Sequence, residues 1–195
     1  MSTSRVAVVV LLLWACGSNK EATPTAASCL PPQAADQGTG IAAVDGVKAT
    51  ACWGGVCLQL DREGMVIGAA TPPVVPPVQV QQDQYIGTKV ARRDPGGQWT
   101  LEDPEKGTKI PLGTPGMRLE VFPPAVVIAF QGKRLHLADA ATLVELGDFT
   151  LTSPIAAIVP WFDRLLIIVE KPAGTAQLDP ATATLYQGPE LPRCR

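Results

Sequence analysis

"VCLQLDREGMVIG", residues 56–68, contains the pattern from which the fold can be predicted. An apolar strand ends at an acidic residue, turn-forming residues follow, and a second short strand ends at glycine. Alternation of apolar and polar residues is typical of a half-buried β-strand, and Asp and Gly favour tight connections between strands. The stretch therefore predicts two antiparallel strands joined by a turn at Asp61.

The same pattern occurs three more times along the chain. The acidic residues at its turns are spaced about 40 residues apart. Apolar segments 41–46 and 155–161 resemble each other as first strands of a repeat. Segments 125–133 and 164–174 resemble each other as second strands, apolar enough for burial on both faces. Four strands in each repeat are typical of β-propeller blades. The further copies are "WTLEDPEKGTKIPLG" (99–113), "RLHLADAATLVELG" (134–147) and "TAQLDPATATLYQG" (175–188), with turn acids Asp103, Asp139 and Asp179.

These "LxLD…tG" strand ends resemble those of quinoprotein-like β-propeller repeats over residues 41–190. The resemblance implies an all-β, four-bladed β-propeller-like domain, which we expect to occupy residues 41–195. Because this chain lacks the blade number of that larger family, the resemblance carries no cofactor residues across, and we expect no cofactor. An alternative that explains the same strands is a β-sandwich of about twelve strands.

Cysteine positions predict one disulfide within a hairpin. In "CWGGVC" (52–57), Gly54-Gly55 is a two-residue turn signal. The register places Cys52 opposite Cys57 in a non-hydrogen-bonded pair, whose Cα atoms lie about 4.5 Å apart. This separation is within the range of a disulfide.

The remaining cysteines of the expected domain and its tether are Cys29 and Cys194. An even number of cysteines in an exported chain implies disulfides, and four of them allow three pairings. With the hairpin pair assigned, Cys29 and Cys194 are left to join the two ends of the domain and to close a ring of blades. Structural metal sites need four Cys or His ligands, and this chain has one histidine and no CxxC, so we expect no metal.

An apolar run near the N-terminus predicts export. Arg5 precedes nine apolar residues, 6–14, and nine helical residues span about 14 Å, against about 30 Å for a bilayer core. The run is therefore read as a signal peptide, residues 1–15, and not as a membrane-spanning helix.

The residues after this run, "LWAC" (13–16), resemble the bacterial lipobox. The resemblance implies that Cys16 carries the lipid, including palmitate-type acyl chains, and becomes the mature N-terminus. Several acyl chains give lasting membrane attachment. By the sorting rule of that family, Gly17 and Ser18 point to the outer membrane, on its periplasmic face or at the cell surface. The alternative is a plain secretory signal cleaved before Cys16, which would leave a free thiol.

Residues 16–40 lack hydrophobic periodicity and predict a flexible tether. The balance of 16 basic and 18 acidic residues gives no basic field for nucleic acid. His136 alternates with two leucines on an expected strand, on the face opposite to them, and is interpreted as an ordinary sheet histidine. Ser153 is the one serine in the expected domain. We therefore expect no enzymatic activity.

Aromatic residues at strand connections are the candidates for partner binding. Trp53 lies in the disulfide hairpin, and Trp161 and Phe162 lie between two expected strands. Aromatic side chains on a rigid scaffold are favoured anchors for proteins. The sequence thus predicts a lipoprotein that acts as a protein-interaction or scaffolding module, an accessory subunit of an envelope machine for secretion, motility or surface assembly. The alternative is a lipoprotein that binds a small ligand or glycan through the propeller channel.

Overall fold

The computed structural model describes residues 29–35, 39–46, 48–74 and 83–195, and these form four antiparallel sheets. Each sheet consists of four strands that are consecutive in sequence and adjacent in space. We call each sheet a blade and number the blades in chain order. A short helix, α1 (Pro32–Ala35), precedes blade 1. Blade 1 contains β1 (Thr39–Asp45), β2 (Lys48–Trp53), β3 (Val56–Leu60) and β4 (Val66–Ala69). Blade 2 contains β5 (Asp83–Ile86), β6 (Lys89–Arg93), β7 (Trp99–Asp103) and β8 (Thr108–Leu112).

Blades 3 and 4 repeat this arrangement, so the predicted all-β, propeller-like class is confirmed and a two-sheet sandwich is not formed. Blade 3 contains β9 (Arg118–Phe122), β10 (Val126–Gln131), β11 (Arg134–Asp139) and β12 (Val144–Thr150). Blade 4 contains β13 (Ile155–Trp161), β14 (Arg164–Val169), β15 (Gly174–Asp179) and β16 (Thr184–Glu190).

The repeated acids have the predicted place in every blade, at the turn between the third and fourth strands. Each carboxylate accepts hydrogen bonds from backbone N–H groups of the turn that follows it. For example, Asp61 Oδ1 accepts from Met65 N at 2.8 Å, and Asp139 Oδ1 accepts from Ala141 N at 2.7 Å. The side chain thus satisfies backbone donors that the strand ladder leaves unpaired, which explains why the residue recurs.

Buried clusters join the blades face to face. Alternate residues of β14 point to opposite faces: Leu166 and Ile168 pack toward blade 1, and Leu165 and Ile167 pack toward blade 3. A third cluster, around Trp99, joins blades 2 and 3. The second strands of blades 3 and 4 are therefore buried on both faces, as predicted.

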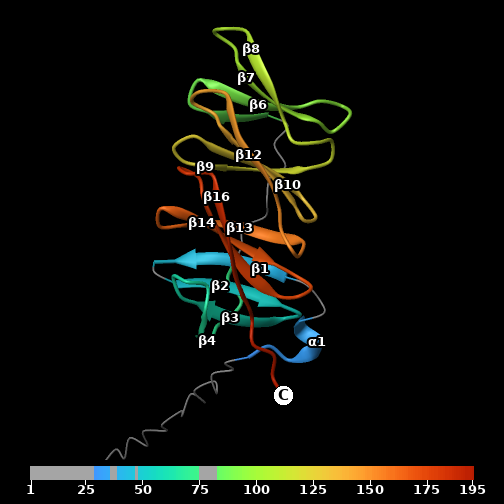
Figure 1. The fold of residues 1–195 in the computed structure, drawn as a ribbon, viewed down its shortest axis with the longest axis vertical. Helices are drawn as coiled ribbons and strands as arrows, with labels where there is room; N and C mark the ends of the chain where they lie inside the picture. Colours follow the sequence, from blue (N-terminus) through green and yellow to red (C-terminus); the bar gives the residue numbers. More distant parts are fainter. Residues whose placement is uncertain (1–28, 36–38, 47, 75–82) are drawn as a thin grey trace, which may run out of the picture.

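The blades form an open stack and not a closed ring. Figure 1 shows blade 2 at the top, followed by blades 3, 4 and 1. Among the described residues no buried cluster joins blade 1 to blade 2. Blades 1 and 2 are consecutive in sequence but lie at opposite ends of the stack, and residues 75–82 between them lie outside the described residues.

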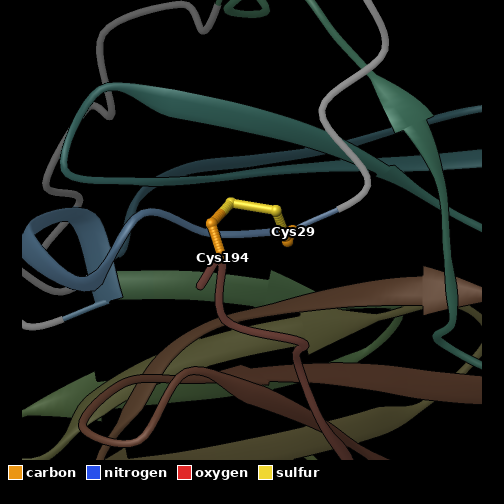
Figure 2. Close-up of a disulfide and its surroundings, with 2 residues drawn as sticks. All are labelled: Cys29 and Cys194. Carbon is orange, nitrogen blue, oxygen red and sulfur yellow. A yellow bond between two sulfur atoms is a disulfide. The ribbon is translucent and has the colours of Figure 1, made fainter.

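Both predicted disulfides are confirmed. Cys52 pairs with Cys57 across the hairpin, with Cα atoms 4.0 Å apart. The second disulfide joins Cys29 to Cys194, with Cα atoms 5.0 Å apart (Figure 2). The expectation that this bond closes a ring is wrong, because it attaches the segment before blade 1 to the segment after blade 4, which are already neighbours.

The segment expected as a tether, residues 16–40, contains ordered residues near its end. Leu30 is fully buried in the cluster between blades 1 and 4, and its backbone N donates to Pro192 O at 2.8 Å. The predicted signal peptide, Cys16 and the rest of the tether up to residue 28 lie outside the described residues. The part of the chain that the structure describes contains no helix long and apolar enough to cross a bilayer.

Candidate functional site

A polar hollow of about 240 Å³ lies where a turn of blade 1 meets a turn of blade 4. The blade 1 turn is the β3–β4 connection, residues 61–65, and the blade 4 turn is the β13–β14 connection, residues 162–163. The residues that line the hollow are Arg62, Glu63, Trp161, Asp163, Arg164 and Gln177.

The blade 1 turn is fixed on blade 4 by backbone contacts. Arg62 O accepts hydrogen bonds from Trp161 Nε1 at 2.8 Å and from Gln177 Nε2 at 2.9 Å. Gly64 has φ +80°, and a Cβ atom there would lie 2.5 Å from Thr175 Oγ1. Glycine is therefore required on both backbone and steric grounds, and the turn holds its place against blade 4.

Phe162 is the exposed aromatic residue of this site. Its side chain is 53% exposed, and its ring packs edge-on against Trp161 with centroids 5.0 Å apart. The guanidinium carbon of Arg62 lies 4.7 Å from the Phe162 ring centroid, in a cation–π contact. Asp163 forms an ion pair with Arg62 at 3.5 Å.

The backbone of Phe162 is unusual for a bulky residue. Its φ is +55°, in the left-handed region that favours glycine. Phe162 begins a two-residue hairpin turn, and the other two-residue hairpin turns of the described residues begin with glycine at φ between +54° and +62°. Those glycines are Gly46, Gly54, Gly87 and Gly132.

A second exposed aromatic residue continues the site along blade 4. The guanidinium carbon of Arg164 lies 4.9 Å from the ring centroid of Tyr186, which is nearly half exposed. Arg164 also donates to Gln177 Oε1 at 3.3 Å. Contacts therefore run without a break from one exposed ring to the other. We call this set the aromatic–arginine strip: Phe162, Arg62, Gln177, Arg164 and Tyr186.

Of the three aromatic residues predicted as anchors, two are not accessible. Trp53 is fully buried and donates through Nε1 to Val169 O at 3.2 Å, so it joins blade 1 to blade 4. Trp161 is 2% exposed and donates to Arg62 O. Both indoles pack between blades, which corrects the prediction that they contact a partner. Phe162 remains at the surface.

Sequence reasoning did not identify the arginines or Tyr186. Arg62 and Arg164 lie about a hundred residues apart, and their meeting depends on contact between blades 1 and 4. One signal was available: Phe162 begins a two-residue connection, and the other two-residue connections between described strands begin with glycine.

A second hollow of about 240 Å³ lies between blades 2 and 3 and includes His136. This histidine is 4% exposed and faces blade 2, opposite the two leucines as predicted. Its Nδ1 lies 2.9 Å from Asp148 Oδ1, and its Nε2 has no hydrogen-bond partner in the described part of the chain. The other lining residues are Pro111, Gly113, Thr114, Arg134 and Glu145.

Ser153 lies elsewhere, so the structure does not bring it to His136. It is buried and lines a small hollow of about 30 Å³ beside Thr175 in blade 4. Within the described ranges no three His, Cys, Asp or Glu side chains come close enough together to hold a metal ion.

Comparison with known proteins gives distant likenesses to solved structures. No family model matches the chain, and no curated protein matches it in sequence. BamB from Moraxella catarrhalis is 18% identical, with a TM-score of 0.38, over 74% of this chain and 47% of that chain. Apo AztD from Citrobacter koseri is 12% identical, with a TM-score of 0.41, over 80% of this chain and 48% of that chain. A chain of the Mitotic Checkpoint Complex is 12% identical, with a TM-score of 0.41, over 80% of this chain and 52% of that chain. The chain thus spans about half the length of these structures.

Proposed function

We propose that this protein is an outer-membrane lipoprotein, anchored through lipid on Cys16, whose β domain binds a partner protein of the cell envelope. In this proposal it is an accessory subunit of a secretion, motility or surface-assembly machine, and it binds rather than catalyses. The observation that supports binding is the aromatic–arginine strip, which has the exposed ring of Phe162 at one end and that of Tyr186 at the other.

The composition of the strip suits protein recognition. Interfaces are enriched in aromatic residues and arginine, and a few such side chains supply most of the binding energy. Arg62 and Arg164 each lie over an exposed ring, so both rings are held in place before a partner arrives. A rigid anchor loses less conformational entropy on binding than a mobile one.

The conformation of Phe162 supports a functional role for this side chain. A left-handed backbone costs a non-glycine residue about 1–2 kcal/mol. The space around the equivalent Gly46 and Gly87 is open, so glycine serves in those turns because of φ alone. Leu143, Lys171 and Ala183 have similar φ values, so the left-handed backbone alone does not set Phe162 apart. The feature that supports contact with another molecule is an exposed aromatic ring at a position where glycine fits.

The disulfides and the lipobox resemblance support the proposed location. Two disulfides are typical of proteins outside the cytosol. Lipid on Cys16 would hold the domain near a membrane, where envelope proteins are available as partners. Labelling with a radioactive fatty acid, in wild type and Cys16→Ser, tests the anchor: label on wild type alone supports it.

The partner is tested by crosslinking in living cells, followed by mass spectrometry of proteins that copurify with the tagged lipoprotein. Phe162→Gly is the informative variant, because glycine suits this turn and the fold is kept. Tyr85→Ala, which removes an exposed aromatic from blade 2, is the matched control. We expect one stoichiometric envelope protein with wild type and Tyr85→Ala, and at least a tenfold loss with Phe162→Gly. Equal recovery of the partner with wild type, Tyr85→Ala and Phe162→Gly would refute Phe162 as part of the binding site. If no protein copurifies with the wild type, a small ligand or glycan is favoured instead.

A further inference from the structure

The outer edge of blade 1 differs from the outer edges of the other blades. In each blade the fourth strand has one edge that no other described strand pairs with. Proteins protect such edges with charged residues or proline, because unpaired backbone groups invite another strand. Blades 2, 3 and 4 follow this rule: β8 carries Lys109 and Pro111, β12 carries Glu145 and Asp148, and β16 carries Pro189 and Glu190.

Strand β4 has no such protection. Its sequence is Val-Ile-Gly-Ala, and the residues from Gly64 to Thr71 include neither a charge nor a proline. The side chain of Ile67 is 48% exposed, and Met65, just before the strand, is half exposed. Blade 1 therefore presents an apolar, uncharged strand edge to solvent.

The backbone of β4 has at least one amide directed outward. Ala70 N donates to Cys57 O of β3 at 2.9 Å, so the amide of Ala70 points into the sheet. Amides of successive strand residues point to opposite edges, and Ala69 pairs with Leu58 in the adjacent, non-hydrogen-bonded register. The Ala69 N–H therefore points to the open edge, where a further strand would accept from it.

The geometry points to β4 as a docking edge for an extended segment of the partner protein, which would add a fifth strand to blade 1. This inference rests on the proposed function and names how the partner binds. Backbone hydrogen bonds would supply affinity, as in other cases of strand addition. Because the edge is uncharged and exposes Ile67, the segment should be uncharged, with apolar or β-branched side chains opposite Ile67.

The place of β4 beside the aromatic–arginine strip favours a partner segment over a second copy of this chain. Pairing of two β4 edges would join four residues from each chain, whereas a stable interface uses about 20–30 residues a side. A segment antiparallel to β4 would leave at Val66, next to the turn that carries Arg62. It would then reach Phe162 and gain the contacts that the edge alone lacks.

The test uses the purified protein with both disulfides formed and a short, fluorescently labelled, blocked peptide of alternating threonine and valine as the probe. Binding is followed by fluorescence anisotropy, and amide exchange by NMR. Because the peptide pairs with the edge alone, we expect weak but saturable binding at millimolar peptide, and at least tenfold slower exchange of the Ala69 amide at saturation. Ile67→Lys should weaken binding at least tenfold because it places a charge at the strand edge. Ala69→Pro should weaken it as much because proline has no N–H to donate to the peptide.

Val144→Lys is the matched control, because Val144 is 50% exposed on the guarded strand β12. It should leave peptide affinity unchanged. Thermal unfolding shows whether each variant is folded, and two different edge variants keep the result interpretable. Absence of saturable binding, unchanged exchange of the Ala69 amide, or equal weakening by Val144→Lys would each overturn the inference. If it fails while Phe162→Gly still loses the partner in cells, the partner docks on the strip alone and the proposed function stands.

Discussion

Phe162 shows how a single residue can be assessed against the repeats of its own chain. The turns at Gly46 and Gly87 connect the first and second strands of blades 1 and 2, as the turn at Phe162 does in blade 4. Their φ values are +58° and +62°, close to +55° at Phe162. The difference between the turns is therefore the side chain, whose effect can be measured by exchanging the two residue types.

Reciprocal substitutions separate the backbone cost from the side-chain contacts. Phe162→Gly relieves about 1–2 kcal/mol of backbone strain and loses two ring contacts worth about 0.5–1.5 kcal/mol each. We expect the free energy of unfolding in urea to change by less than about 1 kcal/mol. Gly87→Phe adds the strain at a position where a Cβ atom would have no neighbour within 4 Å, so it should destabilise by about 1 kcal/mol. A larger loss from Phe162→Gly than from Gly87→Phe would mean that Phe162 is structural.

At the scale of the element, the turn between the third and fourth strands is the unit that repeats in every blade. The environment of the aspartate in this turn differs from blade to blade. In the sequence Asp103 is one of four equivalent turn acids, and nothing in the repeat sets it apart from the others. In the structure Asp103 is 1% exposed, because Lys89 of β6 lies over it and donates to its Oδ2 at 2.7 Å. Sequence spacing could not show this, because the contact joins two hairpins of blade 2.

The pair formed by Asp103 and Lys89 makes blade 2 sensitive to acid. The hydrogen bond from Lys89 holds the pKa of Asp103 below its usual value, with backbone N–H groups of the turn assisting and burial opposing. A carboxyl whose pKa is lower in the folded protein stabilises the fold above its unfolded pKa, and this stabilisation is lost as pH falls through the folded pKa. We therefore expect the Tm of wild type to fall below about pH 4.

Asp103→Asn tests this expectation, because asparagine does not titrate. At pH 7 the variant should have a lower Tm, since Lys89 loses its carboxylate. Below about pH 4 the gap to wild type should narrow. Asp139→Asn, at the equivalent turn of blade 3, is the control. If the difference in Tm between wild type and Asp103→Asn stayed constant from pH 7 to low pH, the Asp103–Lys89 pair would not be the source of the acid sensitivity.

At the scale of the whole molecule, the sequence predicted the blades but not how they stack. Turn acids, alternation and the hairpin at Gly54-Gly55 are local signals, and each was confirmed because it depends on neighbouring residues. The order in which blades touch depends on contacts such as Trp53 with Val169, which lie far apart in sequence. The same contacts buried two of the three predicted anchors and brought together the arginines of the strip.

Among the described residues blade 1 packs against one other blade, blade 4. Its attachment rests on their shared cluster, on hydrogen bonds such as those to Arg62 O, and on the disulfide Cys29–Cys194. That bond closes a loop with a sequence separation of 165, and in the chain-entropy model its loss costs up to about 5 kcal/mol. The hairpin bond Cys52–Cys57 closes a separation of 5, worth about 2 kcal/mol in the same model.

Serine variants of each cysteine pair should therefore behave differently. Without Cys29 and Cys194, we expect blade 1 to open before the rest, so amides of β2 and β3 should exchange at least tenfold faster than those of β10 and β11. The protein without Cys52 and Cys57 should keep its pattern of protection. Hydrogen exchange read by mass spectrometry at neutral pH makes the comparison. Equal loss of protection in all four blades would show instead that the stack unfolds as one unit, with blade 1 held by its core contacts and not by the bond.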